Sequence, residues 1–317
     1  MEKNKNSIKQ IITGSVGTIF GLVVLVIVFT ILNNTFLTTS NITNILIQSG
    51  TNAIIAVGMT FVIVSGNIDI SVGASLALAS CVGAKVMVET GNLWIGIIVT
   101  LLTGIILGAF NGILVAYVGF QPFIVTLSTM WLFRGAAYLF TNGQAVVGLP
   151  DMLSKIVLGK IFYISTIIWL IIVVYIICHI MLQKTSAGRK VCAVGDNTES
   201  ARLSGIDVKK IKLSVFILSG FCSALSGIIY MGRLNSGQPI AGQSYEMYAI
   251  AAAVIGGASL QKGGIGNMVG TLIGSIFISV LQNGLTILNV NTYWQQVCMG
   301  GVLLLAVALD KFRKTVK

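Results

Sequence analysis

The sequence has few charges, few prolines and a single histidine. Charged residues make up 9% of the 317 positions, against about 25% in an ordinary soluble domain, whereas 55% of the residues are apolar. A soluble fold of this length could not bury so much apolar surface, so we expect a lipid bilayer to be its solvent. The 36 glycines and 3 prolines are consistent with a membrane protein, because small residues let helices approach closely within a membrane.

The sequence lacks the residues that most catalytic and metal-binding sites require. His179 has no cysteine or carboxylate at ligand spacing, so the sequence favours neither a metal site nor histidine-based catalysis. The five cysteines are irregularly spaced and four lie in apolar runs, which is typical of packing residues. The glycine-rich segment 256–264 is not a Walker A loop, because Lys262 is followed by glycine and no strand precedes it. We therefore expect no enzyme, no bound metal and no cofactor.

Apolar runs of the length that crosses a bilayer, about 20 residues, recur along the whole chain. The first is too long for a signal peptide and has no small-residue cleavage site, so we expect it to be retained. The eighth is short, and it is either continuous or re-entrant. The fold class expected is an all-α membrane protein, a single transmembrane domain over 1–317 with ten helices at 11–32, 43–64, 70–88, 94–117, 122–140, 161–182, 211–232, 245–260, 268–288 and 294–310.

Basic residues flank these runs rather than forming a patch that could bind nucleic acid. With ten spans both termini lie on one side, and the excess of Lys and Arg there predicts that this side is cytoplasmic. The cytoplasmic parts would be a tail at 1–10, a loop at 183–210 and a tail at 311–317. Fifteen of the 20 basic residues then lie on the inner side, thirteen in these three parts, with Lys212 at the start of the seventh run and Lys262 between the eighth and ninth: Lys3, Lys5, Lys9, Lys184, Arg189, Lys190, Arg202, Lys209, Lys210, Lys212, Lys262, Lys311, Arg313, Lys314 and Lys317.

Two glycine ladders with a spacing of four indicate close helix packing. They are Gly104, Gly108 and Gly112 in the fourth run, and Gly266, Gly270 and Gly274, which begin just before the ninth run and continue into it. They predict helix contacts and carry no information about a substrate.

The loop 183–210 contains a short helix signal. Asp196 is followed by Glu199 at the spacing of a capping box, and Gly205 can end the helix in the left-handed conformation. Two turns are unstable alone in water, so we expect the helix to dock on a partner and to present Ala201 and Leu203. The alternative is a solvated loop whose charges only set the topology.

Asp69 is the one acidic residue between Glu2 and Glu89. A carboxylate at bilayer depth costs about 2.5–3.5 kcal/mol on insertion scales, so it normally faces a cavity or a partner. Asp69 could cap the next helix, or it could act in gating. Arg134, inside the fifth run, could pair with Asp69 or with Glu246.

Other polar residues near the spans are candidates for a solute pathway or for contacts with a second protein. Amides and hydroxyls bind sugars, although such residues often only join helices by hydrogen bonds. The pathway or gating candidates are Asn67, Asp69, Ser71, Asn111, Gln121, Gln282 and Asn283. The outer segment 238–246 could close the mouth of the pathway or receive a binding protein, through Gln238, Gln243 and Glu246.

Several of these motifs together resemble the permeases of ribose-type ABC transporters, within the branched-chain amino acid/ribose permease superfamily. The resemblance runs from about residue 35 to Asp310. It rests on Gly58–Gly73, with Gly-Met-Thr and Asp-Ile-Ser-Val-Gly, on Gly188-Arg189, on 193–206, on Ser236–Pro239 and on Gly270–Gly274. It implies an inner-membrane importer subunit for a monosaccharide, ribose first.

The resemblance also implies partners. They are cytoplasmic ABC ATPase subunits, a periplasmic or lipid-anchored sugar-binding protein, and a second permease copy or a paralogue, all within membrane lipid. The ATPase would contact the loop through Gly195, Asp196, Asn197, Glu199, Ala201, Arg202, Leu203 and Gly205. The alternatives are a secondary sugar transporter coupled to an ion gradient, which would need membrane carboxylates, and an ABC permease for a furanose signalling sugar or a nucleoside.

Overall fold

The computed structural model describes residues 2–312, without the side chains of 2–16, 309 and 312. Helices dominate it, and its strands form only two short antiparallel pairs, β1 with β4 and β2 with β3. The elements are α1 (Glu2–Leu32), α2 (Thr39–Val64), α3 (Val72–Thr90), α4 (Leu93–Ile113), a π-helical turn η1 (Leu114–Val118), α5 (Pro122–Thr141), β1 (Val146–Val147), α6 (Asp151–Leu158), β2 (Lys160–Ile161), β3 (Ile164–Ser165), α7 (Thr166–Lys184), α8 (Ser186–Asp196), α9 (Thr198–Leu203), α10 (Val208–Leu234), β4 (Ser236–Gly237), α11 (Tyr245–Ile255), α12 (Met268–Ile287) and α13 (Thr292–Phe312).

The prediction of an all-α membrane protein is confirmed. Seven described helices are long and apolar enough to cross a bilayer: α2, α3, α4 continued by η1, α5, α7, α10 and α12. Shorter apolar stretches lie in α1, α11 and α13. The predicted span 245–260 is wrong in its extent, because α11 ends at Ile255 after 11 residues. At 1.5 Å per residue α11 is about 16 Å long, roughly half of the hydrocarbon thickness.

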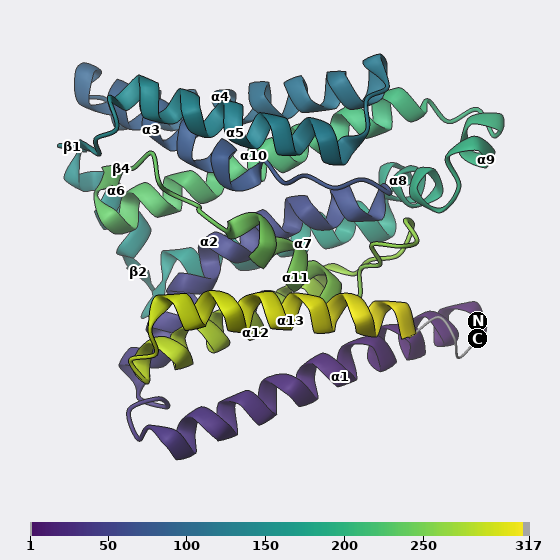
Figure 1. The fold of residues 1–317 in the computed structure, drawn as a ribbon, viewed down its shortest axis with the longest axis horizontal. Helices are drawn as coiled ribbons and strands as arrows, with labels where there is room; N and C mark the ends of the chain where they lie inside the picture. The colour runs from purple at the N-terminus through teal and green to yellow at the C-terminus, as the bar shows by residue number, and fades with distance from the viewer. Residues whose placement is uncertain (1, 313–317) are drawn as a thin grey trace.

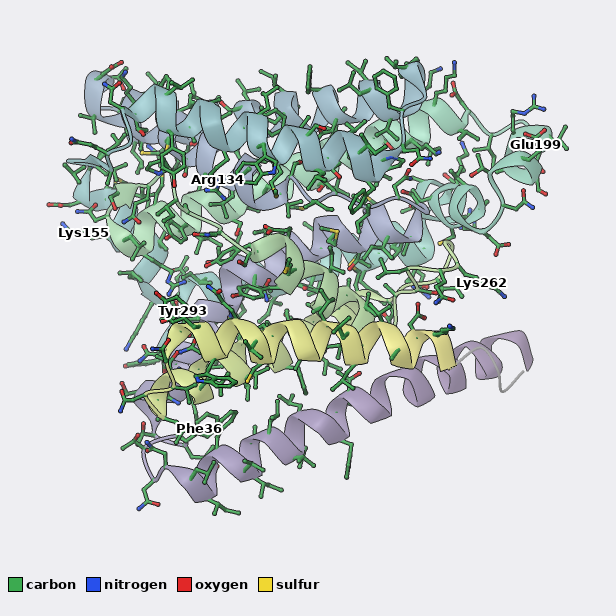
Figure 2. All side chains as sticks on the ribbon, in the orientation of Figure 1. Phe36, Arg134, Lys155, Glu199, Lys262 and Tyr293 are labelled. Carbon is green, nitrogen blue, oxygen red and sulfur yellow. The ribbon has the colours of Figure 1, made fainter. Side chains whose placement is uncertain are left out.

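The helices lie side by side, and their connections gather at two opposite ends (Figure 1). One end, called the α9 end below, holds α8, α9, the start of α1 and the end of α13. The other, the α6 end, holds α6, β1, β2 and β4. Glu199 and Lys262 lie at the α9 end, whereas Lys155 and Tyr293 lie at the opposite end (Figure 2). The polar segments are thus sorted to the two ends of an apolar bundle.

Helix α2 is the most enclosed element of the bundle. Every residue from Ser49 to Val64 is buried, by α7, α10, α11 and α12 among others. Hydrogen bonds join it to its neighbours, among them these: Tyr175 Oη donates to the Ala53 carbonyl (2.9 Å), Ser226 Oγ donates to the Thr51 carbonyl (2.6 Å), and the hydroxyls of Thr60 and Thr271 lie 2.8 Å apart. Such bonds average about 0.6 kcal/mol in membranes, so their main effect is to fix the register of the helices.

Both glycine ladders form close helix contacts, as predicted. A Cβ atom on Gly104 or Gly108 would collide with backbone carbonyls of α10, at Gly220 and Phe216 respectively. A Cβ atom on Gly270 would collide with the Gly256 carbonyl just after α11, and one on Gly274 with the Ala252 carbonyl. Backbone contact of this kind is how helices gain dispersion energy inside lipid.

Candidate functional site

The loop at the α9 end folds into two consecutive helices, α8 and α9. The residue that caps α9 is Asn197, whose Oδ1 accepts a hydrogen bond from the Ser200 N–H (2.9 Å). The predicted cap at Asp196 is therefore wrong by one residue, because Asp196 still belongs to α8. Glu199 instead binds Arg202 through two hydrogen bonds of 3.0 and 2.5 Å, which lower the pKa of the Glu199 carboxyl.

Helix α9 presents one apolar side chain to solvent. Leu203 is 74% exposed, whereas Ala201 is buried, so the prediction that both are presented is wrong for Ala201. Gly205 has φ +78° and follows the helix end, in the left-handed region expected for it. The exposed pair Glu199–Arg202 adds little to stability, so α9 is held mainly by its cap, its glycine and the burial of Ala201.

Helix α8 meets α2 through backbone rather than side chains. A Cβ atom on Gly195 would collide with the carbonyl oxygen of Val64, the last residue of α2, and one on Gly263 would collide with Gly195. The same Val64 carbonyl accepts the N–H of Gly264 (2.7 Å). We call this contact of Val64, Gly195, Gly263 and Gly264 the Gly195 junction.

The Gly195 junction was not predicted from the sequence. The glycines at 263 and 264 suggested only a phosphate loop, which the pattern then excluded. Clustered glycines far from any turn of known type also indicate close backbone approach, and that signal was available.

Asp69 lies at the centre of a buried polar network. Its Oδ1 accepts from the N–H (3.0 Å) and hydroxyl (2.7 Å) of Ser71, and its Oδ2 accepts from the Ser219 hydroxyl (2.8 Å). Asn111 Nδ2 donates to Ser71 Oγ (2.8 Å). The network, called the Asp69 network, joins the start of α3 to α4 and α10. The N-cap of α3 is Ser71, which makes no side-chain cap hydrogen bond, so Asp69 forms an Asx turn just before the helix rather than the helix cap that the sequence suggested.

Arg134 does not pair with Asp69 or Glu246 by an ion pair among the described residues. Its Nη1 donates to the carbonyls of Pro239 and Ala241, both at 2.6 Å. Arg134 thus fastens α5 to the segment between β4 and α11. The cost of placing a guanidinium among helices is offset by these two carbonyl acceptors.

The other pathway candidates lie on three segments: Asn67 follows α2, Gln121 precedes α5, and Gln282 and Asn283 lie on α12. Asn67 is buried and donates to the carbonyl and hydroxyl of Ser65 (2.9 and 2.8 Å). Asn283 accepts from Asn41 Nδ2 (2.9 Å), which joins α12 to α2. Gln121 is exposed just before α5, and Gln282 is half-buried on α12. Asn67 and Asn283 thus make the structural hydrogen bonds that the sequence left as the alternative.

A cavity of about 350 Å³, called the Arg134 cavity, brings polar and aromatic side chains together. It lies between α5 and the segment that leads into α11, beside Arg134 in Figure 2. Two of the three residues predicted to contact a binding protein, Gln243 and Glu246, line this cavity, whereas Gln238 is half-buried and donates to Ser236 Oγ (3.1 Å). The cavity is lined by Met130, Trp131, Arg134, Tyr138, Ile240, Gln243, Ser244 and Glu246.

The aromatic side of this cavity was missed at the sequence level. Trp131, Arg134 and Tyr138 have spacings of three and four, which puts them on one face of α5. Trp131 is 70% exposed and Tyr138 is 40% exposed. The periodicity was therefore a usable signal, but lipid-facing helices also carry exposed aromatic residues at this spacing.

Comparison with known proteins shows which chains share this sequence over its length. Residues 41–307 match the family model described as branched-chain amino acid transport system / permease component. A ribose import permease protein of Haemophilus influenzae is 42% identical over 300 residues, which cover 93% of each chain. A D-allose transport system permease protein of Escherichia coli is 40% identical over 297 residues, 93% of this chain and 91% of the relative.

More distant relatives carry other sugar names. A xylose transport system permease protein of Escherichia coli is 36% identical over 341 aligned positions, 88% of this chain and 86% of the relative. No solved structure matches the chain.

The Asp69 network generates a stability prediction. Replacing Ser219 with Ala leaves a buried carboxylate oxygen without its donor, so we expect the free energy of unfolding to fall by about 1–3 kcal/mol. Ser223→Ala is the matched control, since Ser223 is equally buried on α10 but its hydroxyl donates only to the Ser219 carbonyl of its own helix. The free energy of unfolding of both variants is measured by titration with a denaturing detergent. Equal losses of this free energy in the two variants would contradict the assigned role of Ser219.

Proposed function

The chain belongs to the ribose/monosaccharide-type family of ABC transporter permeases, and we propose that it is the membrane-spanning subunit of an importer for a monosaccharide, ribose first. The observation that carries the proposal is the similarity to three sugar permeases along almost the whole chain. A permease is a transport component rather than an enzyme, and this one is a multi-pass protein of the inner membrane. Allose and xylose are the next candidates, and a furanose signalling sugar or a nucleoside would be further alternatives.

The proposed topology has ten membrane segments and cytoplasmic termini. The segments are α1, α2, α3, α4 with η1, α5, α7, α10, α11, α12 and α13, of which α11 would enter the membrane only partway. The arrangement is supported by the α9 end, where the start of α1, the basic loop with α8 and α9, and the end of α13 lie together. Lys and Arg concentrate at this end, as on the cytoplasmic side of other membrane proteins.

The partner ATPase would bind α9. Leu203 offers the apolar anchor, and the polar residues around it would form the rim of a small interface. ATP would be held by the partner, and the chain itself would bind no cofactor. Two permease chains, identical or paralogous, would share a pair of ATPase subunits, and a sugar-binding protein would contact the α6 end near Gln238, Gln243 and Glu246.

A continuous set of contacts connects α9 with the Arg134 cavity. The Gly195 junction leads to the end of α2, the next residues lead to the Asp69 network, and α3 begins directly after Ser71. In the first turn of α3, a Cβ atom on Gly73 would collide with the Gly242 carbonyl and lie 2.9 Å from Glu246 Oε2. Displacement of α8 and α9 by the ATPase would thus shift the cavity lining through packed backbone, as in other rigid-element switches.

The Arg134 cavity has the chemistry of a sugar passage. Aromatic faces such as Trp131 pack on the apolar side of a sugar ring, while Arg134, Gln243 and Glu246 can bond its hydroxyls. A volume of about 350 Å³ is within the range of small-molecule sites. The exposure of Trp131 fits a passage that delivers sugar onward rather than storing it.

The rival function is a secondary transporter driven by an ion gradient. Such a protein would need a membrane carboxylate free to bind a cation or a proton. Asp69 has donors on both oxygens, so it is already engaged in joining helices, and Glu246 in the first turn of α11 is the carboxylate that such a transporter would have to use. The rival therefore has less support, and it makes the opposite prediction about energy source.

Uptake of labelled sugar by cells with the complete importer tests the proposed function. We expect uptake to continue when a protonophore collapses the ion gradients while glycolysis maintains ATP. We expect at least a hundredfold loss when the Walker lysine of the partner ATPase is replaced, since phosphate binding depends on that lysine. Uptake that stops with the protonophore but survives replacement of the Walker lysine would establish the ion-coupled transporter instead.

The passage is tested by Trp131→Ala in the same importer. Loss of about 1.4 kcal/mol of aromatic contact predicts a roughly tenfold lower uptake rate at saturating binding protein. Trp94→Ala is the control, because Trp94 is also exposed but lies on α4. If both variants transport at the same rate, the sugar does not pass Trp131.

A further inference from the structure

A second cavity, of about 460 Å³, lies at the α9 end where five helices meet. We call it the α8 slot. Its walls include Phe61 of α2, Ile105 of α4, Met181 of α7, Val191 of α8 and Leu218 of α10. The described lining holds no charged side chain, and Ser214 supplies its hydroxyl. Neither the Asp69 network nor the Arg134 cavity includes any of these residues.

The α8 slot adjoins surfaces that face lipid. On α4, Ile106 follows the lining residue Ile105 and is 65% exposed. On α7, Ile177 and Ile180 precede the lining residue Met181 and are exposed as well. The apolar wall of the slot therefore continues the apolar exterior, and an acyl chain could enter from the bilayer without crossing polar surface.

The cytoplasmic rim of the slot is basic. Lys184 comes three residues after Met181 on α7, and Lys210 comes four residues before Ser214 on α10, so each lies one turn beyond the lining on the same helix face. Both are exposed. Arg189 adds a third cation, with its Nη1 donating to the Lys184 carbonyl (3.2 Å). Asp207 pairs with Lys210 at 3.3 Å in an exposed contact, which is weak and leaves the rim net positive.

We propose that the α8 slot binds an anionic phospholipid of the cytoplasmic leaflet, with an acyl chain inside and the phosphate at Lys184 and Lys210. An apolar cavity with a cationic rim at the membrane surface matches an amphiphilic anion, and basic pockets between helices are known to hold anionic headgroups. A cytosolic protein would meet only the rim, because the cavity itself opens beside lipid-facing helices.

The bound lipid would position α8. Ala187, Gly188 and Val191 form the α8 wall of the slot, and the same helix carries Gly195. An acyl chain wedged between α8 and α10 would hold the Gly195 junction closed. This regulatory role rests on the proposed function, whereas lipid binding itself does not.

Native mass spectrometry of the purified chain tests the site without any transport assay. From nanodiscs of phosphatidylcholine and phosphatidylglycerol, we expect retained phosphatidylglycerol. We expect at least tenfold less of it in the double variant Lys184→Gln, Lys210→Gln, since each lysine attracts an anionic lipid. Lys155→Gln with Lys160→Gln, at the α6 end, is the matched control and should retain the lipid.

A variant that fills the α8 slot tests the role of the cavity separately from the role of the lysines. Ser214→Trp keeps both lysines but fills the slot, and we expect it to lose the bound lipid while its melting temperature stays within a few degrees of the parent. Equal phosphatidylglycerol retention in the parent and the double variant would overturn the proposal, and so would retention in Ser214→Trp. If lipid is lost as expected while uptake proves ion-driven, the proposed function fails and the lipid site stands.

Discussion

The carbonyl oxygen of Val64 is the point on which the packing of the α9 end depends. The last carbonyls of a helix have no partner within it, and α2 ends surrounded by other segments, so this oxygen must be satisfied locally. It accepts the Gly264 N–H, and Gly195 lies so close that any side chain there would collide with it. One backbone group thereby joins α2, α8 and the segment between α11 and α12.

From the Val64 carbonyl a series of contacts runs to the Arg134 cavity. Residues 65–71 lead from it to the Asp69 network, where serine and asparagine side chains hold the start of α3 against α4 and α10. Gly73 then brings α3 against the residues that line the Arg134 cavity. The α9 end and the Arg134 cavity are thus connected through backbone contacts and buried hydrogen bonds, which deform less readily than long side chains. The α8 slot lies beside the first of these contacts, where a lipid could influence it.

Local patterns predicted the helices well and the long-range contacts poorly. Apolar runs and glycine ladders placed the long helices, because bilayer thickness and close packing act on consecutive residues. The short helix α9 was predicted with its glycine end, but its cap is Asn197 rather than Asp196, since two adjacent residues could both cap. Helix α11 stops at Ile255, where Gly256 packs against Gly270, a contact invisible to local hydropathy. Which polar residues gather around Arg134 depends on tertiary packing alone.

Coupling from α9 through the Gly195 junction is measured most directly by hydrogen exchange in the assembled importer, with and without a non-hydrolysable ATP analogue. We expect the analogue to change exchange in both 186–205 and 58–73. In Gly195→Ala the change should persist in 186–205 and be lost in 58–73, whereas Gly135→Ala, where a Cβ atom meets nothing within 4 Å, should behave as the parent. A change of parental size in 58–73 of Gly195→Ala would show that the Gly195 junction does not couple α8 to α2.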